Sequence, residues 1–201
     1  MNFEKHSTIE GTHAPFGASQ SAWLRYDDEK AINVLKSKNA AKLGTRLHEW
    51  AKETIDLGIK QPRSNKTLYA YVNDAIGFKM DTEVVLYYSE YFYGTADAIS
   101  FRNGKLRIHD LKTGDSGHME QLEIYAALFC LEYGVSAAEI EIELRLYKND
   151  EIMVFEPPAE EIFDIMDKIV HLDSIFREYE GKEIKKNESH RGTDKISYKF
   201  K

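Results

Sequence analysis

The sequence predicts an α/β protein in which helices flank a mixed β-sheet. Helical periodicity marks the first third of the chain, and three strand-like runs then follow one another between residues 83 and 112. A further helical run separates these strands from two more, and a last helical run ends the pattern. Elements in this order bury their apolar sides by packing the helices onto a shared sheet.

The composition fits one domain with a substantial core. The chain has 201 residues, of which 42% are hydrophobic and 30% charged. No apolar run approaches the roughly 20 residues of a membrane span, and the N-terminus lacks the layout of a signal peptide. Cys130 is the single cysteine, which excludes an internal disulfide and a multi-cysteine metal cluster. We therefore expect a cytoplasmic protein that is one domain over residues 1–201, with a loose lead-in at 1–18.

The charge is distributed unevenly. The net charge is −7, yet residues 182–201 hold seven Lys and Arg against three Asp and Glu, which is +4 and leaves −11 for the rest. An acidic body disfavours strong nonspecific binding to nucleic acid. The basic tail has two interpretations, a solvated end or a strap for a polyanion. In the second interpretation, the contacting residues would be Lys185, Lys186, Arg191 and Lys195.

Caps and apolar spacing predict the first helices. A short helix begins near residue 20, with Ser19 or Ser21 as its N-cap. Residues 40–58 form a longer helix. Its apolar stripe comprises Leu43, Leu47, Trp50 and Leu57. Residues 66–76 form a third helix. The apolar residues at helical spacing there are Leu68, Tyr71, Val72, Ala75 and Ile76.

Three consecutive strands are predicted next, at 83–89, 91–101 and 105–112. The sequence RNG at 102–104 separates the second from the third and is typical of a tight hairpin turn. A helix over 117–134 follows these strands.

Asp115 or Ser116 is the predicted cap of that helix. Two strands, 139–147 and 151–156, come next, and a helix over 157–180 begins with prolines suited to a first turn. The first of these two strands alternates strictly, so we expect its charged residues to point outward. Its inward residues are Ile140, Ile142, Leu144 and Leu146.

A carboxylate and an ammonium, Asp110 and Lys112, end the apolar face of the third strand, because alternate residues share a face. In a hairpin around RNG, Asp97 lies roughly opposite Asp110, on the same face as Tyr93 and Ile99. Two facing carboxylates repel unless a proton or cation lies between them. Lys112 supplies one cation and leaves room for a divalent metal with oxygen ligands. The alternative is a strand-edge ion pair between Asp110 and Lys112, with Asp97 exposed.

Three further residues could join this site. Gln121 and Tyr125 are four residues apart and share one face of the helix that follows the strand. The alternative is a surface Gln and a core Tyr. His48 lies beside the apolar stripe of the 40–58 helix, where it is either a core histidine or a nitrogen ligand suited to Mn²⁺ or a transition metal.

Four motifs, in this order, resemble the nuclease domain of RecB-like exonucleases, a branch of the PD-(D/E)XK superfamily. The motifs are Gly44 with His48, GTAD at 94–97, DLKTG at 110–114, and Gln121 with Tyr125. The resemblance covers residues 40–147 and is tightest at 94–129. Within this family, the chain is most similar in general character to phage-encoded exonucleases.

The resemblance implies a restriction-endonuclease-like αβββαβ core with an N-terminal helical addition. It also implies one or two Mg²⁺ or Mn²⁺ ions, with His48, Asp97, Asp110 and the Leu111 carbonyl as ligands. Some RecB-like nucleases hold an iron–sulfur cluster with four cysteines, and the single Cys130 excludes such a cluster here.

The same resemblance gives the catalytic residues as Asp97, Asp110, Lys112, Gln121 and Tyr125. The lysine would orient or deprotonate the attacking water and stabilise the phosphoryl charge, and the Gln and Tyr would position the lysine, the water or the DNA backbone. The implied function is a metal-dependent DNA exonuclease in recombination, repair or replication. Its partners would be DNA, contacted in part by the basic tail, and a recombination or single-strand-binding protein.

Two other functions fit the same motifs. One is a structure-specific or restriction-type endonuclease of the same superfamily. The other is a catalytically silent nucleic-acid-binding module, although modules of that sort normally lack an acid or the lysine, and this chain fills every expected position. A phage-encoded chain would act in the host cytoplasm.

Overall fold

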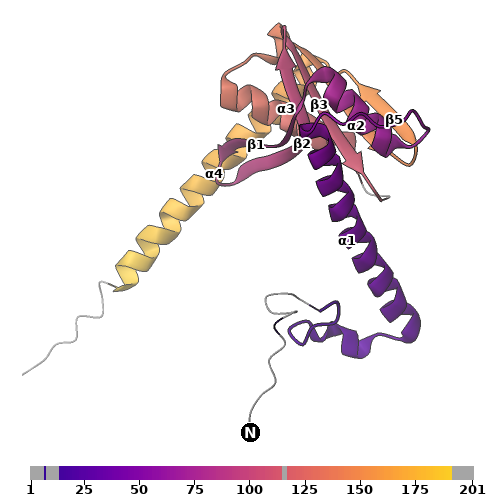
Figure 1. Ribbon diagram of the computed structural model, residues 1–201. Coiled ribbons are helices and arrows are strands. Elements are labelled where there is room, and N and C mark those ends of the chain that lie inside the picture. The colour runs from indigo at the N-terminus through magenta and orange to yellow at the C-terminus, as the bar shows by residue number, and fades with distance from the viewer. Residues whose placement is uncertain (1–6, 8–13, 115–116, 192–201) are drawn as a thin grey trace, which may run out of the picture. The chain divides into compact units, whose positions relative to one another are not determined.

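The computed structural model describes residues 7, 14–114 and 117–191, with side chains described as far as Lys182 (Figure 1). The chain divides into two compact units, Met1–Trp50 and Ala51–Lys201, and the division falls inside helix α1 (Asp28–Asp56). The expectation of one domain over residues 1–201 stays a prediction.

The first unit contains a short 3-10 helix, η1 (Ser21–Arg25), and the beginning of α1. The residue before η1 is Gln20, which makes no capping hydrogen bond through its side chain. The prediction of Ser19 or Ser21 as N-cap is therefore wrong, because Ser21 is already the first helical residue.

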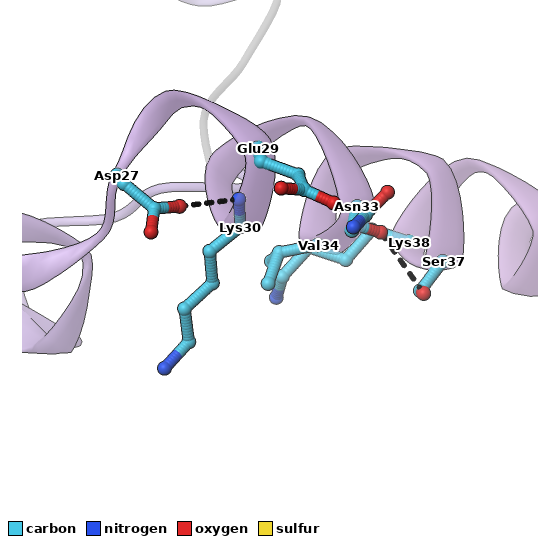
Figure 2. Close-up of a pocket in the computed structure, with 7 residues that line it drawn as sticks. All are labelled: Asp27, Glu29, Lys30, Asn33, Val34, Ser37 and Lys38. Carbon is cyan, nitrogen blue, oxygen red and sulfur yellow. Dashed lines mark hydrogen bonds between the residues drawn. The ribbon is translucent and has the colours of Figure 1, made fainter.

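The long helix α1 starts at Asp28, well before the predicted residue 40. Asp27 caps it, since its Oδ1 accepts a hydrogen bond from the Lys30 backbone N–H at 2.8 Å. Figure 2 shows these first turns, with a pocket of about 530 Å³ lined by seven residues between Asp27 and Lys38. None of the residues predicted to carry chemistry lines this pocket.

The buried side of α1 differs from the predicted one. Leu43 and Leu57 of the predicted stripe are 55% and 72% exposed, so that prediction is wrong. Ala51, Thr54 and Ile55 are buried instead. The periodicity correctly indicated a helix, but Ala51, Thr54 and Ile55 form its buried side rather than the leucines that defined the stripe.

Helix α2 (Thr67–Phe78) matches its prediction, with Tyr71, Val72 and Ala75 buried. Three strands follow: β1 (Asp81–Ser89), β2 (Phe92–Arg102) and β3 (Lys105–Lys112).

The turn between β2 and β3 is a tight hairpin, as predicted. Asn103 and Gly104 have φ angles of 52° and 74°, and positive values at both central residues define the type I′ turn that suits the twist of paired strands.

The second half of the chain contains α3 (Met119–Tyr133), the short helix η2 (Ala137–Glu139), β4 (Glu141–Lys148), β5 (Glu151–Phe155) and α4 (Ala159–Arg191). The predicted caps Asp115 and Ser116 lie outside the described residues. They do not adjoin α3, which begins directly after His118. Helix α4 continues past residue 180, so Lys185, Lys186 and Arg191 are part of a helix rather than of a loose tail.

The five strands form one sheet in the order β1-β2-β3-β4-β5. Neighbouring strands are antiparallel except for β3 and β4, which run parallel and are joined through α3 (Figure 1). The α/β class with a mixed sheet flanked by helices is confirmed, and the order of elements agrees with an αβββαβ core.

Helices cover both faces of the sheet. On one face, apolar residues of β3 and β4 form a core with α3 and α4 that includes Ile108, Leu122 and Ile162. On the other face, the α2 residues Tyr71 and Phe78 make edge-on ring contacts with Tyr147 and His109 at 5.3 and 5.7 Å.

This second layer overturns the prediction that the charges of β4 point outward. Glu143 is buried, and Lys105 binds its carboxylate at 3.0 Å. Arg145 binds the same carboxylate at 2.9 Å and Asp74 of α2 at 3.1 Å. A strand whose two faces are both covered can keep charged residues only by pairing them.

The alternation of β2 changes phase at Asp97. Ala96 and Ile99 both belong to the core on the α3 side, although they are three positions apart and regular alternation would set them on opposite faces. Tyr93 is 64% exposed, so the prediction that Asp97 shares one regular face with Tyr93 and Ile99 is wrong. The irregularity lies where β2 and β3 part, since Ala98 and His109 are the last residues that pair at this end of the hairpin.

Candidate active site

Strand β3 ends in a buried carboxylate. Asp110 is 2% exposed, and the Lys112 ammonium lies 3.0 Å from its Oδ1 and 2.9 Å from its Oδ2. Only the contact with Oδ1 has the geometry of a hydrogen bond, and Oδ2 is buried without one. The Asp110–Lys112 pair that the sequence indicated therefore exists, but it lies inside the protein rather than at an exposed strand edge.

Lys112 is held from a second side by α3. Its Nζ donates to Gln121 Oε1 at 3.0 Å, and Gln121 Nε2 donates to the Tyr125 hydroxyl at 2.9 Å. The four-residue spacing on α3 thus brings Gln121 and Tyr125 to the D-x-K strand, as the sequence suggested. The result is a chain of polar contacts from Tyr125 through Gln121 and Lys112 to Asp110.

Asp97 lies at the neighbouring position of β2. Its Oδ2 accepts a hydrogen bond from the Leu111 backbone N–H at 3.0 Å, which replaces a strand–strand bond where β2 and β3 separate. Because Ala98 pairs with His109, the next step along the hairpin would place Asp97 opposite Asp110. The pairing of the strands ends at Ala98 and His109, so the opposition of the two carboxylates stays a prediction.

Two glycines allow this network to close. A Cβ at Gly94 would lie 2.8 Å from Tyr125 Cε1, and a Cβ at Gly117 would lie 2.6 Å from Lys112 Cγ. Gly117 also has a φ of +138°, which side chains disfavour. Gly94 belongs to the GTAD motif, whereas no local pattern indicated Gly117.

Sequence reasoning missed one acidic residue. Ligand oxygens of Glu83 on β1 and Asp97 on β2 lie within 4.8 Å of each other. Only the pairing of β1 with β2 brings the two residues together, because Glu83 lies 14 residues before Asp97 in the sequence. In the sequence alone, Glu83 is one charged residue in a strand. With Glu83, Asp97 and Asp110 against Lys112, the formal charge of the group is −2.

The tyrosines near these carboxylates are held in their neutral form. Burial raises the pKa of Tyr71 well above its usual value, and the charges of Asp97 and Asp110 add to the effect. Burial also raises the pKa of Tyr125, against the opposing effect of its hydrogen bond with Gln121. Both phenols therefore keep their protons at neutral pH and can act as hydrogen-bond donors.

The remaining predicted site residues are His48, the Leu111 carbonyl and the basic residues near the C-terminus. His48 belongs to the first unit, on the side of α1 that continues into the buried Ala51 and Ile55, and its role as a metal ligand stays a prediction. The Leu111 carbonyl stays a predicted ligand in the same sense. Lys185, Lys186 and Arg191 lie in the C-terminal part of α4, beyond the described side chains, and Lys195 lies outside the described residues.

The described group combines acids, a paired lysine and two positioned polar side chains on four elements of the second unit, β1, β2, β3 and α3. Oxygen ligands at this density suit Mg²⁺ or Mn²⁺, and a lysine beside them can stabilise developing negative charge. Across the part of the chain that the structure describes, we find no helix with the length and apolar character needed to cross a membrane. No family model, curated protein or solved structure matches the chain.

Proposed function

We propose that this protein is a metal-dependent DNA exonuclease that hydrolyses phosphodiester bonds. The observation that carries the proposal is the position of Lys112, whose ammonium is held between the buried Asp110 and Gln121 beside Asp97. A lysine that served only as a strand-edge partner would not need a glutamine fixed by a tyrosine on a separate helix.

The residues present fit a divalent cation. Asp110 Oδ2 is buried without a hydrogen bond, and a carboxylate oxygen has lone pairs that a cation can satisfy. Asp97 and Asp110 would hold the ion, with the Leu111 carbonyl and His48 as the further ligands that the family resemblance implies. A bound Mg²⁺ or Mn²⁺ would polarise the phosphate and lower the pKa of water.

The chain's own residues would then orient the reaction. Lys112 would place one positive charge beside the phosphate oxygens, where charge grows as the bond to water forms. Gln121 and Tyr125 would fix the ammonium, because Gln121 Oε1 accepts from Lys112 while Gln121 Nε2 donates to the phenol. Such positioning keeps a flexible lysine within reach of the reacting atoms.

Digestion of end-labelled DNA tests the proposal. We expect cleavage of linear DNA with Mg²⁺ or Mn²⁺, no cleavage with EDTA, and intact covalently closed circles. Cleavage of the closed circles would identify an endonuclease instead. Binding without cleavage of any DNA would identify a silent binding module and overturn the proposal.

Lys112→Ala is the matched variant, and Lys168→Ala, at an exposed position of α4, is its control. We expect the first to lose nearly all cleavage while keeping its fold and DNA affinity largely intact, because the lysine acts mainly in the transition state. Activity of Lys112→Ala within tenfold of wild type would show that the lysine is only an ion-pair partner.

The proposed setting is DNA recombination, repair or replication in the cytoplasm, or in the host cytoplasm for a phage-encoded chain. The proposed partners are DNA and a recombination or single-strand-binding protein. Retention of the chain on immobilised DNA with a steep salt dependence would support the first of these, since each released counterion adds to the slope.

A further inference from the structure

Strand β1 contains an acidic residue in an unusual backbone conformation. Glu83 has a φ of 52° inside an otherwise extended strand. Residues with a Cβ rarely adopt this left-handed region, because the Cβ crowds the following carbonyl. The flanking Thr82 and Val84 pair with Ala98 and Ala96, so strand pairing on both sides holds Glu83 in this conformation.

The register sets Glu83 opposite Asp97. Its carboxylate comes within 4.8 Å of an Asp97 oxygen, although like charges at that separation repel each other. Tyr71 on α2 is close enough to be affected by these carboxylates. Burial raises the pKa of its phenol, and the charges of Asp97, Asp110 and Glu83 all add to the effect. The charges of three carboxylates, on three adjacent strands, thus act on one phenol.

Asp110 provides a second and independent indication of a ligand. Its side chain is 98% buried, and Oδ2 makes no hydrogen bond even though it lies 2.9 Å from the Lys112 ammonium. Besides its ion pair with Lys112, this oxygen keeps lone pairs that a bound cation could use. Three carboxylates against one ammonium leave a charge of −2, which is the charge that one divalent cation neutralises.

We propose that Glu83 is a further ligand of the metal ion in the active site proposed above, on which this inference rests. Unlike Asp97 and Asp110, Glu83 is exposed, so it would bind the ion from the solvent side of the strands. The constrained backbone fixes the direction of the Glu83 Cα–Cβ bond before the ion arrives, which lowers the ordering that binding requires.

Calorimetric titration of the full chain with Mn²⁺ tests this role without relying on cleavage. We expect Glu83→Gln, which keeps the side-chain volume, to weaken Mn²⁺ binding at least about tenfold, the lower end of what the loss of metal-site partners costs. Glu83→Gly should weaken it similarly. Glycine also fits a positive φ, so the metal-free melting temperature of Glu83→Gly should equal or exceed that of wild type.

Lys79→Gly is the matched backbone control. Lys79 also has a left-handed φ, 54°, at the end of α2, and it is not part of the carboxylate group. We expect this variant to bind Mn²⁺ as wild type does. An equal loss of Mn²⁺ affinity in Lys79→Gly and Glu83→Gly would show a general backbone effect and overturn the ligand role.

Asp97→Asn separates the two proposals. If Asp97→Asn abolishes Mn²⁺ binding while both Glu83 variants bind as tightly as wild type, the Glu83 role is refuted and the proposed function stands. If wild type itself does not bind Mn²⁺ or Mg²⁺, the metal-dependent function fails, and the role of Glu83 fails with it.

Discussion

Strand β2 approaches α3 closely at Gly94, and we therefore expect a larger side chain at this position to destabilise the protein. A Cβ at this position would lie 2.8 Å from Tyr125 Cε1, at least 0.6 Å short of an ordinary 3.4 Å contact. Tyr125 is only 9% exposed, so its ring cannot swing into solvent to make room. Gly94→Ala must therefore displace the ring, the strand or both.

The expected cost combines two opposing effects. Overpacking of a tight site costs about 1–3 kcal/mol. Replacement of glycine by alanine in a strand returns about 0.5–1 kcal/mol, because the unfolded chain loses conformational freedom. The net destabilisation is about 1–2 kcal/mol, which for a chain of this size lowers the melting temperature by roughly 2–8 °C.

Thermal melts of the metal-free chain provide the measurement, with Gly77→Ala as the matched control. Gly77 lies in α2, and a Cβ there meets nothing within 4 Å, so the same substitution should stabilise by about 0.5–1 kcal/mol. The two variants should shift the melting temperature in opposite directions. Stabilisation by Gly94→Ala equal to that of the control would refute the close approach.

A double variant ties the effect to the Tyr125 ring. In the Gly94→Ala background, Tyr125→Leu should cost much less stability than it does alone, because the smaller side chain relieves the clash. The displaced ring should also loosen Gln121 and hence Lys112, so Gly94→Ala should cleave DNA more slowly than wild type. Additive stability effects would show that Gly94 and Tyr125 do not interact.

Three further predictions concern charge and burial. Asp110→Asn should leave the metal-free stability within about 1 kcal/mol of wild type, because loss of the ion pair with the partly exposed Lys112 and relief of the repulsion from Asp97 act in opposite directions. Mn²⁺ should raise the melting temperature of wild type but not of this variant. An equal rise in both would contradict the metal site. Burial raises the pKa of Cys130 to about 11. Below about pH 8.5, the pKa of an unfolded thiol, Cys130 is neutral in both states and has no effect on the pH dependence. Between about pH 8.5 and 11 only the unfolded thiol ionises, so the free energy of unfolding should fall as the pH rises. Cys130→Ala should lose this slope, and an unchanged slope would contradict the prediction. Deletion of residues 192–201 should weaken DNA binding and flatten its salt dependence, since fewer counterions are released, whereas an unchanged slope would show that this segment does not contact DNA.

Local patterns in the sequence determined the kinds and order of the elements. Positive φ angles at Asn103 and Gly104 arise from the residues themselves, so the hairpin could be predicted from RNG alone. The hairpin register predicted that Asp97 lies opposite Asp110, and the four-residue spacing on α3 placed Gln121 beside Tyr125. Period and turn chemistry act over a few residues, which is why these parts of the site could be predicted.

Only the tertiary structure decided which surfaces are buried and which distant residues meet. The second face of β4 is covered because α2 packs on it, and so Glu143 is a buried ion-pair partner rather than a solvated charge. The proximity of Glu83 to Asp97 and the need for glycine at Gly117 likewise depend on strand pairing and on the path of the chain around Lys112. These features arise from contacts between residues far apart in sequence, and no local period or propensity carries that information.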